Sequence, residues 1–232
     1  MKEFAFDRSS QRYRVTSGPG KGQYISATAV LELTEKYIDQ LKTDVSTVAD
    51  KLVEGKITVA TWEETTAKTL KELHLNSYAL GKGGVAQMSS RDYGIIGSEL
   101  RSEYEYLRGF SQDILKGELS EAQLRDRLSL YIDAAYSSYE RGRFESHRSN
   151  GYNWERRYRN SAQSCSSCVV YAARGWQPLG SQPHIGEACE CGNRCRCHKE
   201  YSKDRRRPKD SLLTQNWGYI GVSFDAFKSR LG

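Results

Sequence analysis

The sequence has little proline: four prolines in 232 residues, three of which, Pro178, Pro183 and Pro208, follow residue 175. Proline ends or kinks a helix because it has no backbone N–H and its ring clashes with the preceding turn. Apart from Pro19, the first 170 residues therefore contain no proline that would interrupt long helices.

Long apolar runs are also lacking. No stretch approaches 18 apolar residues, so we expect no membrane-spanning helix and no membrane partner. Residues 1–8 lack the apolar core of a secretion signal, which predicts an intracellular protein. In a reducing compartment, cysteines more often serve as metal ligands or free thiols than as disulfides.

No assembled catalytic motif is present. His74 and His147 are isolated, and the glutamates at 63–64 suit a solvated first turn of a helix. A cysteine nucleophile would require Cys168 and His184 to meet in space. We therefore predict that the protein is not an enzyme and takes no small-molecule substrate.

The net charge of +6 is unevenly distributed, with −3 over residues 1–140 and +9 over residues 141–232. A basic C-terminal part can bind nucleic acid, and it can equally be a solvated face or a contact for an acidic protein. The run Arg205, Arg206, Arg207 and Lys209 is the candidate for phosphate contact, with a solvated tail as the alternative.

Apolar residues at three- and four-residue steps predict four long helices. The expected ranges are about 26–54, 58–80, 89–116 and from 120 through 139. Ser89 with Asp92, and Ser120 with Gln123, have the spacing of capping boxes that begin helices. The glycines at 81, 83 and 84 are expected to break the second helix.

One local pattern occurs twice, at residues 55–62 and 117–124. Each copy has a glycine that ends a helix, an apolar residue two positions later and a hydroxyl that begins the next helix. The repeat predicts two αα-hairpins packed as one antiparallel bundle. The repeat has two possible explanations: a duplication of the hairpin, or the need of any two such corners for the same residue types.

Arginines alternate with aromatic residues between residues 141 and 159. Such a stretch can grip a nucleic-acid backbone, or it can be a helix whose arginine stems pack on rings. We favour the second interpretation, because the fourth helix leads directly into this stretch.

All six cysteines lie within residues 165–197. Cys165 and Cys168 form a C-x-x-C pair, which can aim two thiolates at one zinc ion. A second cluster follows at residues 189–197 and supplies more sulfur ligands than a tetrahedral site needs. Disulfides and free buried thiols are the alternatives.

The predicted zinc ligands are Cys165 and Cys168 with two of Cys191, Cys195 and Cys197. Residues alternate between faces on an extended chain, so Cys195 and Cys197 should point the same way. Arg194 and Arg196 should favour the thiolate forms.

The stretch C-x-x-C, A-R-G-W-x-P-L-G and C-G-N-R-C-R-C at residues 165–168, 173–180 and 191–197 resembles the C-terminal motif of phage head-morphogenesis (minor capsid, Mu F-like) proteins. In that family a histidine usually precedes the C-R-C motif, and Cys191 stands roughly at its place here. Cys189 has no clear counterpart. The resemblance covers about residues 26–202.

The resemblance implies a few-copy virion component that acts near the portal during head assembly, in the host cytoplasm and then in the particle. Its implied partners are portal, major capsid or scaffolding proteins, with DNA as a further candidate partner. The alternative is a zinc-knuckle protein that binds nucleic acid.

The predicted fold is mainly α, with an antiparallel bundle of long helices followed by a small α+β cysteine-rich module. The expected segments are a flexible 1–25, a helical domain 26–160, a cysteine-rich knuckle 161–202, and a basic linker with a docking segment 203–232.

Overall fold

The computed structural model describes residues 4–7, 10, 12–160 and 164–204. The chain divides into two compact units, residues 1–146 and residues 147–232. We call them the helical unit and the cysteine-rich unit, and each is described by itself. Within the described residues, no helix has the length and apolar character needed to cross a membrane.

The helical unit begins with a small antiparallel sheet of β1 (Phe4–Asp7), β2 (Arg12–Val15) and β3 (Tyr24–Ile25). Tyr13 and Val15 on β2 are buried, whereas Arg12 and Arg14, which alternate with them, are exposed. The segment 1–25 was predicted to be flexible, but residues 4–7, 12–15 and 24–25 form strands, and the described residues between β2 and β3 form turns. The alternation of β2 buries one face of the sheet.

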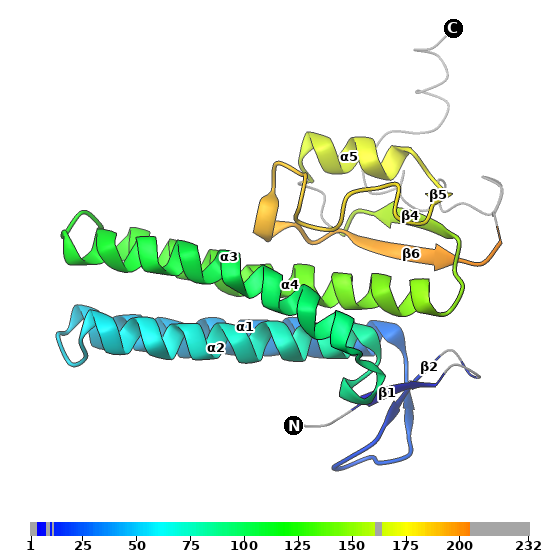
Figure 1. Cartoon of the computed structure of the whole chain (residues 1–232), viewed down its shortest axis with the longest axis horizontal. Coiled ribbons are helices and arrows are strands. Elements are labelled where there is room, and N and C mark those ends of the chain that lie inside the picture. The colour runs from blue at the N-terminus through cyan, green and yellow to red at the C-terminus, as the bar shows by residue number, and fades with distance from the viewer. Residues whose placement is uncertain (1–3, 8–9, 11, 161–163, 205–232) are drawn as a thin grey trace, which may run out of the picture. The chain divides into compact units, whose positions relative to one another are not determined.

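Four long helices follow, as predicted, and Figure 1 shows them side by side. They are α1 (Ala27–Val53), α2 (Val59–Lys82), α3 (Ser90–Leu115) and α4 (Glu121–Ser149). A short 3₁₀ turn, η1 (Val85–Gln87), links α2 to α3. The mainly α class is confirmed, and the cysteine-rich unit adds the small α+β part.

The two corners that repeat in the sequence have the same backbone hydrogen bonds. In each, a glycine with positive φ follows the helix, at +69° for Gly55 and +71° for Gly117. Thr58 and Ser120 then cap the next helix by accepting a hydrogen bond from the N–H three residues on. Each corner is a Schellman motif. At the first corner, the backbone N–H groups of Gly55 and Lys56 donate to the carbonyl oxygens of Leu52 and Lys51, respectively. At the second corner, the N–H groups of Gly117 and Glu118 donate in the same way to the carbonyl oxygens of Ile114 and Asp113.

An aromatic cluster fills part of the helical core. The rings of Trp62 and Phe110, both with no exposed surface, meet edge to face with centroids 5.3 Å apart. Tyr131 stacks on Phe110 at 6.1 Å, and the Arg127 guanidinium lies 4.4 Å from the centre of the Phe110 ring. This cluster joins α2, α3 and α4, so burial of large rings stabilises the bundle.

Gly81 does not break α2 as predicted: it lies inside the helix, where α2 crosses α4. A Cβ on Gly81 would lie 2.0 Å from the carbonyl oxygen of Tyr139, and a Cβ on Gly142 would lie 2.2 Å from that of Tyr78. The helix instead ends at Gly83, whose φ of 103° is left-handed. The two glycines therefore allow the backbones to touch.

A polar chain of the buried His74 and Ser138 and the half-buried Glu99 connects three helices of the same unit. His74 Nδ1 lies 2.8 Å from Ser138 Oγ, and Ser138 Oγ donates to Glu99 Oε2 at 2.9 Å. His74 is 2% exposed, and burial lowers its pKa to about 4. The imidazole is therefore neutral at pH 7.

The cysteine-rich unit is built on a three-stranded antiparallel sheet in the order β5-β4-β6. β4 (Trp154–Tyr158) is central, between β5 (Gln177–Pro178) and β6 (His198–Ser202). The short helix α5 (Ser166–Ala173) and the 3₁₀ turn η2 (Gly192–Arg194) complete the unit.

The predicted continuation of the fourth helix through residue 159 is wrong. α4 ends at Ser149, and Gly151 at φ +75° turns the chain into β4. Arginines do pack on rings, as with the Arg156 guanidinium 4.7 Å from the centre of the Tyr158 ring. Because β4 pairs along its whole length with β6, it belongs to the cysteine-rich unit, and the boundary falls before it instead of at residue 160.

A buried ion pair ties β4 to β6. Lys199 Nζ donates to Glu155 Oε2 and to the carbonyl oxygen of Gln182, each at 3.0 Å. The other oxygen of Glu155 accepts from the backbone N–H of Gln182 at 2.8 Å. The loop before the second cysteine cluster is thus fastened to the sheet by charge-assisted bonds.

Candidate metal centre

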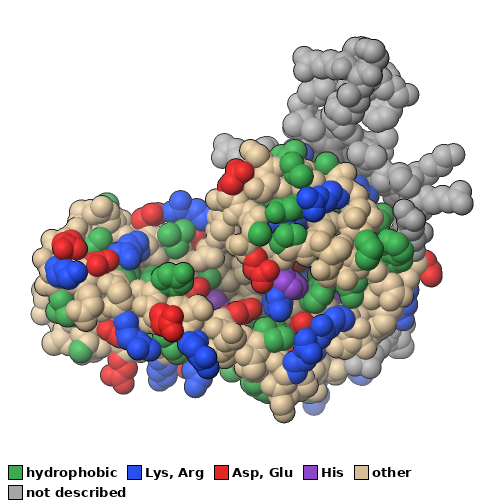
Figure 2. Space-filling view, turned by 45° about the horizontal axis from the view of Figure 1, so that its top comes forward, with side chains coloured by type: hydrophobic (Ala, Val, Ile, Leu, Met, Phe, Trp, Pro, Cys, Tyr) green, Lys and Arg blue, Asp and Glu red, His purple; other side chains and the backbone are tan. Residues whose placement is uncertain are grey.

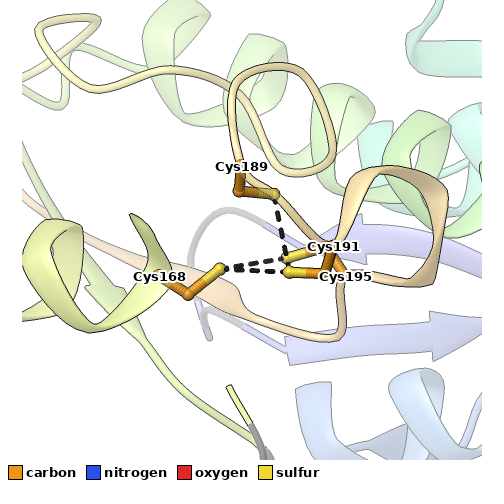
Figure 3. A group of neighbouring side chains, drawn as sticks. All are labelled: Cys168, Cys189, Cys191 and Cys195. Carbon is orange, nitrogen blue, oxygen red and sulfur yellow. Dashed lines mark hydrogen bonds between the residues drawn. The ribbon is translucent and has the colours of Figure 1, made fainter. Parts of the chain in front are cut away.

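The cysteines reach one place from three parts of the cysteine-rich unit. Cys165 is the N-cap residue of α5, and Cys168 lies in the first turn of that helix. Cys189 and Cys191 come from the loop before η2, and Cys195 caps the end of η2. Figure 3 shows the sulfur of Cys168 pointing toward those from the loop and from η2.

Four sulfurs form a compact group. Those of Cys168, Cys189, Cys191 and Cys195 all lie within 4.8 Å of one another. The Sγ–Sγ distances are 3.5 Å for Cys168–Cys191 and 3.7 Å for both Cys168–Cys195 and Cys189–Cys191. A tetrahedral zinc site with Zn–S bonds of about 2.3 Å has sulfurs about 3.8 Å apart. The spacing shows that these cysteines could bind a metal ion.

Two further cysteines border this group. Cys165 Sγ lies 3.1 Å from Cys191 Sγ, and the Cys197 thiol hydrogen-bonds with Cys168 and Cys195. Cys195 and Cys197 are both buried, with the half-buried Arg196 between them. The five predicted ligands therefore lie in one connected set of sulfurs, to which the structure adds Cys189, the cysteine that the predicted set omitted.

Disulfides do not occur among the cysteines. All six lie in the described part of the chain, and all six are free thiols. The closest measured pair, Cys165 and Cys191 at 3.1 Å, is far beyond the S–S bond length of about 2.05 Å.

Arg157 supplies a buried positive charge to the sulfur cluster. It lies on β4, is 1% exposed, and its Nη2 is 3.7 Å from Cys168 Sγ and 3.5 Å from Cys195 Sγ. A hydrogen bond with Cys197 and the contact with Arg157 lower the pKa of Cys195 to about 4. Although burial opposes it, the interaction with the cysteines raises the pKa of Arg157 above its usual range. Cys195 is thus a thiolate that is paired with the guanidinium of Arg157.

Arg194 and Arg196 were predicted to favour the thiolate forms of the cysteines, but the arginine whose side chain contacts the sulfurs is Arg157. Arg194 is exposed, and Arg196 Nη1 donates to the carbonyl oxygens of Asn193 and Cys195, each at 3.2 Å. Arg157 was missed because its place beside the sulfurs depends on the pairing of β4. The only signal in the sequence was its position among aromatic residues in a short β-favouring run.

The candidate nucleic-acid residues divide into two sets. Arg205, Arg206, Arg207 and Lys209 lie outside the described residues, as does the docking segment. Arg156 and Arg157 are described, and both are buried. On the face shown in Figure 2, basic and acidic side chains are interspersed over the described residues.

Comparison of the chain with protein-family models, with curated proteins and with solved structures finds no match.

Proposed function

We propose that the cysteine cluster holds zinc as a structural ion, and that the protein is a non-enzymatic component of phage head assembly. The observation that supports the zinc site best is the group of four sulfurs at near-tetrahedral spacing. An all-thiolate donor set suits zinc, and four protein ligands leave no open position for a substrate. The ion would join α5 to the loop and η2.

The role in head assembly rests on the motif residues that resemble the head-morphogenesis family. These motif residues also build the sulfur cluster. The C-x-x-C pair lies at the start of α5, and the C-R-C motif at 195–197 directly precedes β6. Between them, the G-W-x-P-L-G run supplies β5 at Gln177–Pro178. The proposed protein is a few-copy virion component near the portal, with portal, capsid or scaffolding proteins as partners.

Metal analysis tests the zinc site. Protein purified without chelator should contain zinc, and Cys168→Ser should lose most of it because Cys168 is fully buried in the group of four. Ser166→Ala, an exposed neighbour on α5, is the matched control and should retain zinc. Wild-type protein without bound zinc would exclude the site.

Mass spectrometry of purified particles and procapsids tests the role in assembly. Peptides of this chain should appear in a few copies per particle, and the protein should co-purify with the portal. Their consistent absence from both kinds of particle would refute the role and leave the zinc site unaffected.

Nucleic-acid binding is the competing interpretation. Arg156 and Arg157 are buried, so a basic surface would have to come from other residues. Binding through phosphate contacts falls steeply with salt. A gel shift that is strong at low salt and lost at high salt, with no particle association, would favour this alternative.

A further inference from the structure

Cys168 lies at the centre of the sulfur cluster. Its Sγ is 3.5 Å from that of Cys191 and 3.7 Å from that of Cys195. It also hydrogen-bonds with the thiols of Cys165 and Cys197. Its side chain has no exposed surface, so every neighbour of this sulfur is supplied by the protein.

Cys191 is a second centre of the cluster. Its Sγ lies 3.1 Å from Cys165, 3.5 Å from Cys168 and 3.7 Å from Cys189. It also belongs, with Cys195, to the group in which all sulfurs are within 4.8 Å of one another. Cys168 and Cys191 thus lie beside each other between two outer pairs of sulfurs.

A single zinc ion leaves two thiols of this cluster unused. With Cys168, Cys189, Cys191 and Cys195 as ligands, Cys197 would remain a thiol that is 3% exposed and hydrogen-bonded to two ligands. Cys165 would remain against Cys191 at 3.1 Å. Each of these two thiols therefore contacts at least one sulfur of the group of four.

We infer that the six cysteines form a single site for two zinc ions, in which Cys168 and Cys191 are shared. This inference rests on the proposed zinc site. The outer pair Cys165 and Cys189 completes the ligands of one ion, and the outer pair Cys195 and Cys197 completes those of the other. Each ion then has four thiolate ligands, as zinc prefers.

The chemistry of thiolates is consistent with sharing. A thiolate sulfur has several lone pairs and can bind two ions, and modules with two zinc ions on six cysteines are an established class of zinc site. The second divalent ion balances the charge of the two added thiolates, so the net charge of the cluster does not change. Arg157 contacts Cys168 and Cys195, one shared and one outer sulfur.

Native mass spectrometry of the full chain, purified with zinc and without chelator, tests the inference. Wild-type protein should carry two zinc ions per chain. Cys165→Ser and Cys197→Ser each remove one outer ligand and should reduce the count to one, whereas the control Ser166→Ala should retain two.

Cadmium-113 NMR of the wild-type protein gives a second measurement that does not depend on how the variants fold. Two resonances, each split by coupling through the shared sulfurs, are expected. One zinc per chain with a single cadmium resonance would overturn the two-ion site and leave the single zinc site intact. No bound metal would overturn both.

Discussion

His74 shows how a residue that is isolated in the sequence acquires a role in the fold. Its partner Ser138 lies 64 residues further along the chain, and the pair is completed by Glu99 on a third helix. No periodic pattern in the sequence indicates this contact, because the contact depends on how the helices pack. Ser89 with Asp92, by contrast, forms the predicted capping box, since both partners lie in one turn.

The depressed pKa of His74 predicts a pH dependence of stability. Burial lowers that pKa from 6.5 to about 4, so between these values the unfolded chain binds a proton that the folded chain does not. The unfolding free energy is therefore highest above pH 6.5 and falls as the pH drops toward 4. The loss from this residue amounts to about 3 kcal/mol.

Urea unfolding followed by circular dichroism, at several pH values between 7 and 4, checks this prediction. His74→Gln keeps a polar side chain but cannot titrate, so its stability should fall less than that of the wild type over the same range. Identical pH profiles for the two proteins would mean that His74 does not contribute.

At the scale of elements, the helices could be predicted and the first sheet could not. The helices are long enough for their apolar period to appear, and their ends are set by local glycine and hydroxyl chemistry. β1 and β2 have four residues each and β3 has two, which is too short for a period-two pattern to stand out. Their pairing depends on contacts across a turn.

The close crossing of α2 and α4 predicts that glycine-to-alanine substitutions lower the stability of the protein at the crossing and raise it elsewhere on the helices. A methyl group at Gly81 or Gly142 meets a backbone carbonyl oxygen at 2.0 or 2.2 Å, so the helices must move apart. Gly81→Ala and Gly142→Ala should each destabilise the protein by about 3 kcal/mol or more. The free energy of urea unfolding is the measurement.

Gly97→Ala on α3 is the matched control for this prediction. A Cβ there meets nothing within 4 Å, and alanine is the better helix former. This variant should be more stable than the wild type by about 1 kcal/mol. Equal effects at all three glycines would contradict the close crossing.

For the whole molecule, the sequence predicted a bundle followed by a cysteine-rich module, but placed the boundary too late. β4 was assigned to the helical part because Arg156 and its neighbours looked like a continuing amphipathic helix. Only the pairing of β4 with β6 shows that β4 belongs to the cysteine-rich unit. The same pairing places Arg157 beside sulfurs from α5 and η2, which no spacing in the sequence could show.

Removal of the metal is expected to affect the two units differently. All six cysteines belong to the cysteine-rich unit, so a strong chelator should abolish the hydrogen-exchange protection of β4 and β6. The helical unit has its own buried core, and its amides should keep their protection. Hydrogen-exchange mass spectrometry measures both units at once.

Cys168→Ser serves as the reference for this experiment. Chelator should change its exchange pattern little, because the variant is expected to have lost most of its metal already. Loss of protection throughout α1–α4 in the wild type would contradict independent stability of the units.

The contact between Tyr78-x-x-Gly81 and Tyr139-x-x-Gly142 is reciprocal: each glycine faces the carbonyl of the tyrosine three residues before the other glycine. Such a relation is what a two-fold axis generates in an isologous homodimer. Here it occurs within one chain, between helices that each follow a Schellman corner. At this point the halves α1–α2 and α3–α4 therefore contact each other as the two subunits of such a dimer would. Because one chain connects them, each molecule contains one copy of each half.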